Sequence, residues 1–286
     1  MQLAVSSAST PSLTPAELIA AAASSGYAGI EWRVSDDVDR LDEASGWNFR
    51  SNNRCTVAQN AGALQEIAAR CADAGLSIVG LSPYLTVGDI AAAEDLIGIA
   101  ADIGVSRIRV WAPSTREPGP YRPAIERMRR WLSDLEPVLL RHRVRFALEV
   151  HQATVCPSAA MALRMLDGID TAAVGVLYDI GNLAVEGFEH PPLALELIGD
   201  RLTHVQIKNA VWLSPGAGRP WQWHWCPMDE GQLDLPGIVA ALVDAGFAGW
   251  ISAEDFSTRQ TDLDKLTRNH MLLQRWISDA HSRHTR

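Results

Sequence analysis

Short apolar runs and longer amphipathic runs alternate along the 286-residue chain. The short runs place apolar and polar residues on opposite faces, which is typical of β-strands, whereas the longer runs repeat apolar residues at helical spacing. The pattern predicts eight strands, at residues 2–6, 29–33, 77–81, 107–111, 145–151, 175–179, 202–208 and 250–254. Strands that alternate with helices pair in parallel through crossover connections, so we expect an α/β fold.

Capping residues mark where the predicted helices begin and end. Thr14, followed by Pro15 and Glu17, is typical of a helix start, and Gly26 stops that helix. Gly75 stands in the same way at the end of the next helical run. We expect helices at residues 14–23, 57–74, 90–103, 123–141, 158–166, 192–198, 236–245 and 261–280.

The number of these units points to a particular α/β architecture. Eight strands, each followed by a helix or by a loop and a helix, fit a closed (β/α)8 TIM barrel, which needs roughly 250 residues. The sequence has no Gly-rich dinucleotide loop and no Walker-type phosphate loop, which weakens a doubly wound sheet as the alternative. We therefore predict a single TIM-barrel domain over residues 1–286, with long loops at 35–54 and 211–232.

Composition narrows the class of protein. Apolar residues make up 47% of the chain, and the net charge is −9. An acidic balance disfavours nucleic-acid and anionic-membrane partners, which need basic surfaces. The apolar runs are far shorter than the ~20 residues of a membrane-spanning helix, and no signal peptide is predicted. The four cysteines form no C-x-x-C pair and are expected to be free thiols in a reducing cytoplasm.

Four predicted strands carry one polar metal-ligand residue near the C-terminal end. These residues are Glu149, Asp179, Gln206 and Glu254. A carboxylate in an otherwise apolar strand is costly unless it is paired or coordinated, and a divalent cation is the simplest shared partner. Oxygen ligands without a thiolate favour Mn²⁺ or Mg²⁺, with Co²⁺ or Zn²⁺ as alternatives.

Alternation along the strands predicts which polar residues share the barrel interior. Because successive side chains point to opposite faces, the apolar face of each strand should pack under the helices. The polar face should then line the mouth where active sites of this fold lie. The expected lining is Glu31, Arg33, Glu149, His151, Asp179, Gln206, Lys208 and Glu254, with His204 one layer deeper.

Several segments of the chain resemble one family of enzymes. In chain order they read GYAGIEWR, ALEVH, VLYDIGN, LTHVQIKNA, DEGQLDLPGIVAAL and GWISAEDF. Together they are similar to the xylose isomerase-like sugar phosphate isomerase/epimerase barrels, over essentially the whole chain. The resemblance implies a TIM barrel that binds one divalent ion through Glu149, Asp179, Gln206 and Glu254.

Two positions depart from the ketose 3-epimerases of that family. Their third metal ligand is usually a histidine, where this chain has Gln206. They also have a substrate-binding histidine three residues after the aspartate, where this chain has Asn182. A glutamine as third ligand is more similar to the hydroxypyruvate isomerase branch. The resemblance thus implies an isomerase or epimerase of a small sugar, keto-sugar or other hydroxy-carbonyl compound, without naming the substrate.

The implied chemistry is proton transfer next to a carbonyl. The ion would polarise the carbonyl and stabilise an enediolate, while Glu149 and Glu254 would remove and return the proton. Loss of a β-hydroxyl from the same intermediate would make the protein an inosose-type dehydratase, which is the alternative. The side chains expected to contact substrate are His151, Asn182, Lys208, Glu31, Arg33 and His224. His204 is expected to orient the carboxylates.

Some of these residues also have a purely structural interpretation. Lys208 could neutralise the enolate or simply pair with a carboxylate, and His151 could bind substrate or hold Glu149. The cluster of Trp212, Trp221, Trp223, His224 and Trp225 is compatible with a sugar-stacking lid. It is equally compatible with a loop buried between subunits, so a homo-oligomer is an open expectation.

Two other classes of protein could share the predicted barrel. An endonuclease IV-like nuclease would need a trinuclear zinc cluster with more histidines, and the acidic balance is unfavourable for DNA. A non-catalytic sugar-binding protein would be expected to lack one of the three ligand carboxylates, and all three are present. The sequence therefore predicts a metal-dependent sugar isomerase or epimerase with no nucleic-acid or membrane partner.

Overall fold

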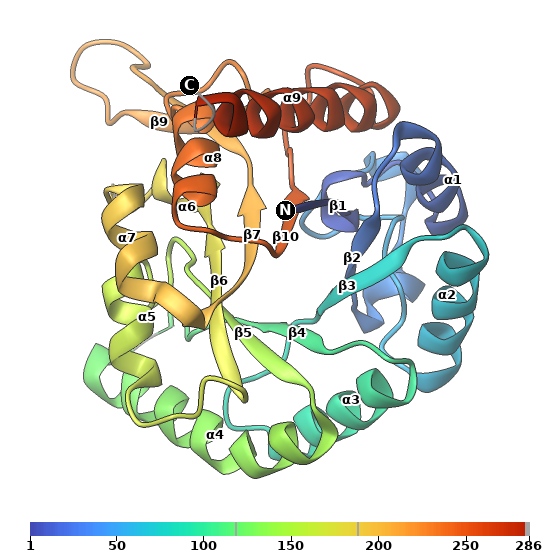
Figure 1. Cartoon of the computed structure of the whole chain (residues 1–286), viewed down its shortest axis with the longest axis vertical. Helices are drawn as coiled ribbons and strands as arrows, with labels where there is room; N and C mark the ends of the chain where they lie inside the picture. Colours follow the sequence, from blue (N-terminus) through green and yellow to red (C-terminus); the bar gives the residue numbers. More distant parts are fainter. Residues whose placement is uncertain (118, 188, 284–286) are drawn as a thin grey trace.

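Eight parallel strands close into a barrel in the computed structural model, which describes residues 1–117, 119–187 and 189–283 (Figure 1). The strands are β1 (Gln2–Ser6), β2 (Gly29–Arg33), β3 (Ser77–Ser82), β4 (Arg107–Val110), β5 (Arg145–Glu149), β6 (Val174–Asp179), β7 (Leu202–Ile207) and β10 (Trp250–Ala253). They pair in sequence order, and β10 closes the barrel by pairing with both β7 and β1. The predicted (β/α)8 architecture is confirmed.

A ring of helices surrounds the barrel (Figure 1). The helices are α1 (Pro15–Ser25), α2 (Ala61–Asp73), α3 (Ile90–Asp102), α4 (Tyr121–His142), α5 (Ala159–Leu166), α6 (Ile180–Leu183), α7 (Pro191–Ile198), α8 (Leu235–Asp244) and α9 (Asp262–Arg283). Within the described ranges, no helix is both long and apolar enough to cross a membrane.

The start of α1 shows how local sequence sets an element boundary. The Thr14 hydroxyl accepts a hydrogen bond from the Glu17 backbone N–H, and the Glu17 carboxylate accepts one from the Thr14 backbone N–H. This reciprocal capping satisfies two backbone donors that the first helical turn leaves free. Gly26 adopts φ 89° and ends the helix, as the sequence predicts.

The strand faces divide as alternation predicts. Ile30 and Trp32 of β2 and Phe146 and Leu148 of β5 are completely buried members of the apolar core. The opposite face carries polar side chains into the barrel. Because β2 and β7 are not neighbours in the sheet, a contact between side chains of these two strands has to cross the barrel interior.

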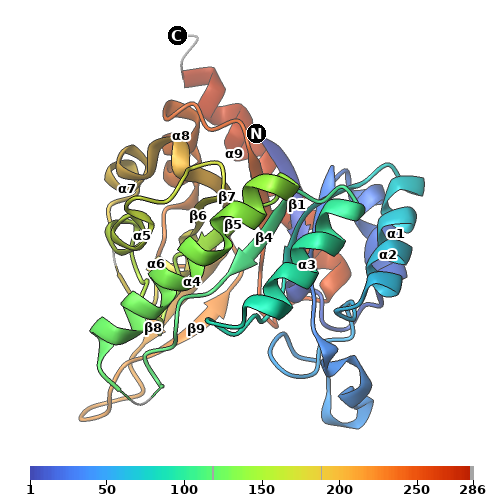
Figure 2. The same cartoon turned by 90° about the horizontal axis from the view of Figure 1, so that it is seen from below.

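The largest departure from the sequence prediction lies in the expected loop 211–232. It contains an antiparallel hairpin of β8 (Asn209–Leu213) and β9 (Gln222–Cys226). Alternation in the tryptophan-rich sequence Gln-Trp-His-Trp-Cys suits a strand with one covered and one open face. The other long segment, 35–54, contains two short 3₁₀ turns. Both project from the same side of the barrel (Figure 2).

Candidate active site

The four strand-end residues converge beside one cavity of about 990 Å³. Glu149 ends β5, Asp179 ends β6, Gln206 lies in β7 and Glu254 directly follows β10. The register of β6 and β7 places Asp179 directly opposite Gln206. All four side chains are buried, and all except Asp179 line the cavity. The structure therefore brings together the residues that the sequence singled out.

Lys208 lies between two of the carboxylates. Its ammonium group donates to Asp179 Oδ2, and it contacts Glu254 Oε2 at 2.6 Å. Burial opposes the charge on Lys208, but the neighbouring carboxylates outweigh that effect and raise its pKa. Burial also raises the pKa of Asp179 to about 6 and that of Glu254 to about 7, although Lys208 partly offsets both shifts.

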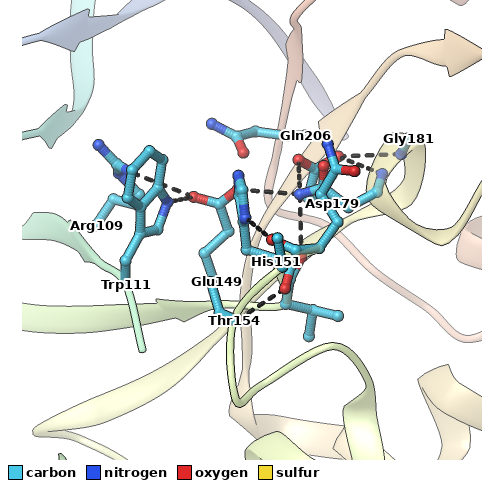
Figure 3. A network of polar contacts seen from close by, with 12 residues as sticks. Arg109, Trp111, Glu149, His151, Thr154, Asp179, Gly181 and Gln206 are labelled. Atoms are coloured by element: carbon cyan, nitrogen blue, oxygen red, sulfur yellow. Dashed lines mark hydrogen bonds and ion pairs between the residues drawn. The ribbon is translucent and has the colours of Figure 1, made fainter. Parts of the chain in front are cut away.

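Glu149 is held from three sides (Figure 3). Its Oε2 accepts from the Trp111 indole N–H and lies 3.5 Å from Arg109 Nη1, while its Oε1 accepts from Asn182 Nδ2 at 3.2 Å. Burial raises the pKa of Glu149 against the lowering effect of Arg109 and Lys208. These contacts fix the orientation of the carboxylate at the cavity wall.

His151 lines the cavity next to Glu149. Its Nε2 lies 3.9 Å from Glu149 Oε1, and its Nδ1 is 2.5 Å from the Gln152 carbonyl oxygen. Burial and the nearby charge of Lys208 lower the pKa of His151 to about 4. The imidazole is therefore neutral at neutral pH.

Asp179 and Asn182 are linked through the start of the short helix α6. Asp179 Oδ1 accepts from the backbone N–H groups of Gly181 and Asn182, at 3.0 and 3.4 Å (Figure 3). The side-chain amide of Asn182 donates to Asp179 Oδ2, and also to Glu149 and the Val150 carbonyl. Asn182 thereby joins two of the carboxylates.

Gln206 is oriented from beneath by Glu31. Its Nε2 donates to Glu31 Oε1 at 2.8 Å, and Glu31 Oε2 lies 3.1 Å from His204 Nε2 across the barrel interior. Burial works against the charge of Glu31. The contacts with His204, Ser82 and Ser252 prevail, however, and lower its pKa to about 2. A charged Glu31 can only accept, so it selects the amide orientation that leaves Gln206 Oε1 free.

The donor chemistry of this cluster fits a hard divalent cation. Gln206 Oε1 and Asn182 Oδ1 are buried oxygens without a hydrogen-bond partner in the described part of the chain. Three carboxylates lie beside them, and oxygen donors of this kind suit Mn²⁺ or Mg²⁺. Across residues 1–117, 119–187 and 189–283, no three His, Cys, Asp or Glu side chains are already grouped around one ion position. Lys208 bridges Asp179 and Glu254, so an ion would have to replace its ammonium group.

Two residues expected to contact substrate lie elsewhere. Glu31 does not line the cavity, because it is buried in the barrel interior against His204 and Gln206. His224 is exposed on β9, whereas its neighbours Trp223 and Trp225 line the cavity. The alternation of the unexpected strand β9 explains this, since adjacent residues point to opposite faces.

Aromatic rings form part of the cavity wall. Phe49, from the segment 35–54, stacks on Phe256 with ring centroids 4.1 Å apart. Trp225 of the hairpin lies 5.7 Å from Phe256 and 4.8 Å from Trp223. The two segments that project from the barrel thus meet around the site, and their rings offer apolar faces to a ligand.

Sequence reasoning missed Arg109, Trp111 and Tyr84, which also line the cavity. Arg109 stands between Ile108 and Val110 in β4. The alternation rule that singled out Glu149 would therefore have found it. Trp111 and Tyr84 follow their strands, and no pattern in the sequence distinguishes them from core aromatics.

Comparisons with known proteins identify the family to which this fold belongs. Residues 19–276 match the model of the xylose isomerase-like TIM barrels, so the chain belongs to that family. No curated protein sequence gives a significant match.

Solved structures with the same fold have low sequence identity to this chain. An L-ribulose 3-epimerase is 17% identical with a TM-score of 0.72, covering 99% of this chain and 97% of its own. A probable 3-DHS dehydratase from Bacillus anthracis is 16% identical with a TM-score of 0.70, covering 96% and 99%. A xylose isomerase-like protein from Mycobacterium smegmatis in complex with magnesium is 17% identical with a TM-score of 0.67, covering 98% and 97%.

Proposed function

We propose that this protein is a divalent-metal-dependent isomerase or epimerase that moves a proton next to the carbonyl of a small sugar or keto-sugar. The observation that carries the proposal is the convergence of three buried carboxylates, Glu149, Asp179 and Glu254, beside an aromatic-walled cavity. Membership of the xylose isomerase-like family supports it. The fold relative named as an epimerase and the relative that contains magnesium also support it.

Glu149 and Glu254 are the proposed proton carriers. They reach the cavity from β5 and from the end of β10, so they can act on different sides of a bound substrate. Burial raises the pKa of Glu254 to about 7 in the metal-free site. In this proposal, its carboxyl group exchanges a proton with the substrate at the cavity wall. A divalent ion held by Glu149, Asp179, Gln206 and Glu254 would supply the positive charge that polarises the carbonyl and stabilises the enediolate.

The remaining residues bind and orient the substrate in this proposal. Lys208 lines the cavity. Once an ion takes the place of its ammonium group between Asp179 and Glu254, that group would be available to the negative charge that develops on the substrate oxygen. Asn182 holds Asp179 and Glu149 in fixed relation. The rings of Phe256 and Trp225 exclude water and present a face for stacking.

Dehydration is the second candidate. It begins with the same proton removal, and a fold relative of comparable TM-score is named a probable dehydratase. The two reactions differ in whether the enediolate is reprotonated or expels a β-hydroxyl. Because the carboxylates serve both, the products have to distinguish them.

Metal content and proton exchange test the proposal. We expect the purified protein to bind one Mn²⁺ or Mg²⁺ per chain and to exchange the α-proton of at least one ketose, inosose or hydroxypyruvate with D₂O. Retention of the substrate mass apart from deuterium indicates isomerisation or epimerisation, whereas loss of water indicates dehydration. Three zinc ions per chain would point to a nuclease instead. The absence of any bound metal and of any exchange would point to a binding protein.

A further inference from the structure

The cavity has a second charged region, opposite in sign to the carboxylates. Arg33 lines the cavity and is only 4% exposed. Its guanidinium donates to three uncharged oxygens: Thr56 Oγ1 at 2.5 Å, Tyr84 Oη at 3.0 Å and the Arg50 carbonyl at 3.2 Å. In the described part of the chain, it forms no ion pair. Arg33 is therefore a buried cation without a counter-ion.

Arg109 is a second buried cation of this region, and it contacts one carboxylate. It lines the same cavity and is 5% exposed. Its Nη2 donates to the Pro83 carbonyl at 2.7 Å, and its only carboxylate within the described ranges is Glu149, at 3.5 Å. Its Nε has no partner there either. The guanidinium stacks 4.1 Å above the Trp111 ring, which contacts the cation without neutralising it.

One aromatic residue joins the two guanidinium groups. Arg33 and Arg109 lie 5.0 and 5.2 Å from the centre of the Tyr84 ring. At the cavity rim, Arg50 and Arg116 add two further cations that form no ion pair in the segments that the structure describes. This side of the cavity is consequently cationic, whereas the side formed by β5, β6 and β10 is acidic.

A buried charge is costly unless a counter-ion or a complete set of hydrogen bonds compensates it. The planar guanidinium fork matches a carboxylate or phosphate with two parallel hydrogen bonds. We propose that the substrate carries an anionic group, carboxylate or phosphate, that Arg33 and Arg109 bind while the hydroxy-carbonyl end faces Glu149. The contact between Arg109 and Glu149 places both ends within the length of one small molecule. This inference rests on the proposed function for the reactive end alone.

Three ketoses that differ only at C6 test the inference without any variant. D-fructose carries a neutral hydroxymethyl group there, D-fructuronate a carboxylate and D-fructose 6-phosphate a phosphate. We expect calorimetry on the Mn²⁺-loaded protein to show at least roughly tenfold tighter binding of one anionic probe than of fructose, as charge-assisted hydrogen bonds would provide. The tighter anionic probe identifies the group. If neither anionic probe binds more tightly than fructose, the inference is wrong.

Substitutions test whether Arg33 and Arg109 cause the preference for anionic ketoses. Arg33→Met, which leaves every contact of Glu149 intact, should remove the anionic preference and leave fructose binding within about threefold, and Arg33→Lys should restore only part of the preference, because an ammonium lacks the fork. Arg109→Met should also remove the preference, and it should weaken fructose binding as well, because Arg109 holds Glu149. Arg70→Gln, on the exposed face of α2, is the control. A preference that survives in both Met variants would overturn the assignment to these arginines.

Exchange of the α-proton with D₂O separates this inference from the proposed function. Anionic preference without exchange in any ketose would refute the proton-transfer function and retain the anion site. Exchange with neutral ketoses and no anionic preference would retain the proton-transfer function and refute the anion site.

Discussion

The two sides of the barrel mouth occupy equivalent positions in the fold but have opposite charge. Strands β5, β6 and β10 deliver Glu149, Asp179 and Glu254, whereas β2 and β4 deliver Arg33 and Arg109. All five side chains are buried and come from strand ends or their near neighbours. The barrel therefore supplies positions around a cavity, and the residue type at each position determines what that part of the cavity can bind.

The two sides also differ in how far the chain neutralises its own charges. On the acidic side, Lys208 contacts Asp179 and Glu254 directly. On the cationic side, Arg33 forms no ion pair in the described segments, and the carboxylate that contacts Arg109 is Glu149, at 3.5 Å. The acidic side can thus persist without a ligand because it contains an internal cation. Arg33 has no such partner in the described segments, and Arg109 has only Glu149, which is why we assign the two guanidinium groups to substrate.

The largest expected effect comes from removing the carboxylate charges of the acidic side while keeping the shape of the side chains. Glu149→Gln and Glu254→Gln should each lower the rate of α-proton exchange by roughly 10²–10⁴-fold, because each removes a proposed proton carrier. NMR in D₂O measures the rate on any ketose that wild-type protein exchanges. Glu66→Gln, an exposed change on α2, is the matched control. Exchange at the wild-type rate in both site variants would refute the roles of these carboxylates.

Glu31 links the two sides of the barrel mouth, because it comes from β2, on the cationic side, and orients Gln206 on the acidic side. Glu31→Gln can donate as well as accept, so Gln206 would no longer be held with its Oε1 free. We expect Mn²⁺ affinity to fall by roughly 10–100-fold, although Glu31 is not a proposed ligand. Titration calorimetry measures the affinity. Ser82→Ala, which removes a different hydrogen bond to Glu31, should have a much smaller effect. An unchanged affinity in Glu31→Gln would remove the orienting role.

The pH dependence of metal binding tests the raised pKa values of the acidic side. Burial raises the pKa of Asp179 to about 6 and of Glu254 to about 7, and the metal binds the deprotonated forms. Affinity for Mn²⁺ should therefore rise as the pH increases from about 5 to about 8. The slope should reach about tenfold per pH unit for each proton released. Calorimetry in buffers of different protonation enthalpy counts the released protons. A flat affinity over this range would contradict the raised pKa values.

Strand alternation predicted much of the fold and the acidic side. It placed Glu149 and Gln206 on the inward face, opposite apolar residues that the structure buries under the helices. Capping residues predicted both ends of α1. The proposed roles of these residues in metal binding and proton transfer remain predictions. Their positions beside one cavity are what the structure adds.

The two predicted substrate contacts that lie away from the cavity, His224 and Glu31, have a common physical explanation. The sequence pattern predicts a loop at 211–232 and a substrate contact for His224, but only the pairing of β8 with β9 decides which face each residue takes. Glu31 and Arg33 share a face of β2, but Arg33 is at the end of the strand and Glu31 is two residues deeper in the barrel. The structure buries Glu31 inside the barrel and places Arg33 at the cavity. Depth depends on the contacts made across the barrel, which local patterns do not contain.

The eight βα units, the inward carboxylates and the family can be predicted from the chain alone, because they depend on periodicity and on short segments of local sequence. The contacts across the barrel come from its closure: Lys208 bridges two carboxylates, Glu31 orients Gln206, and Arg33 lies beside Arg109 with no ion pair of its own in the described segments. These relations join residues that are up to 175 positions apart in the chain. They arise when the barrel closes and brings non-neighbouring strands to the same interior, so no local pattern encodes them.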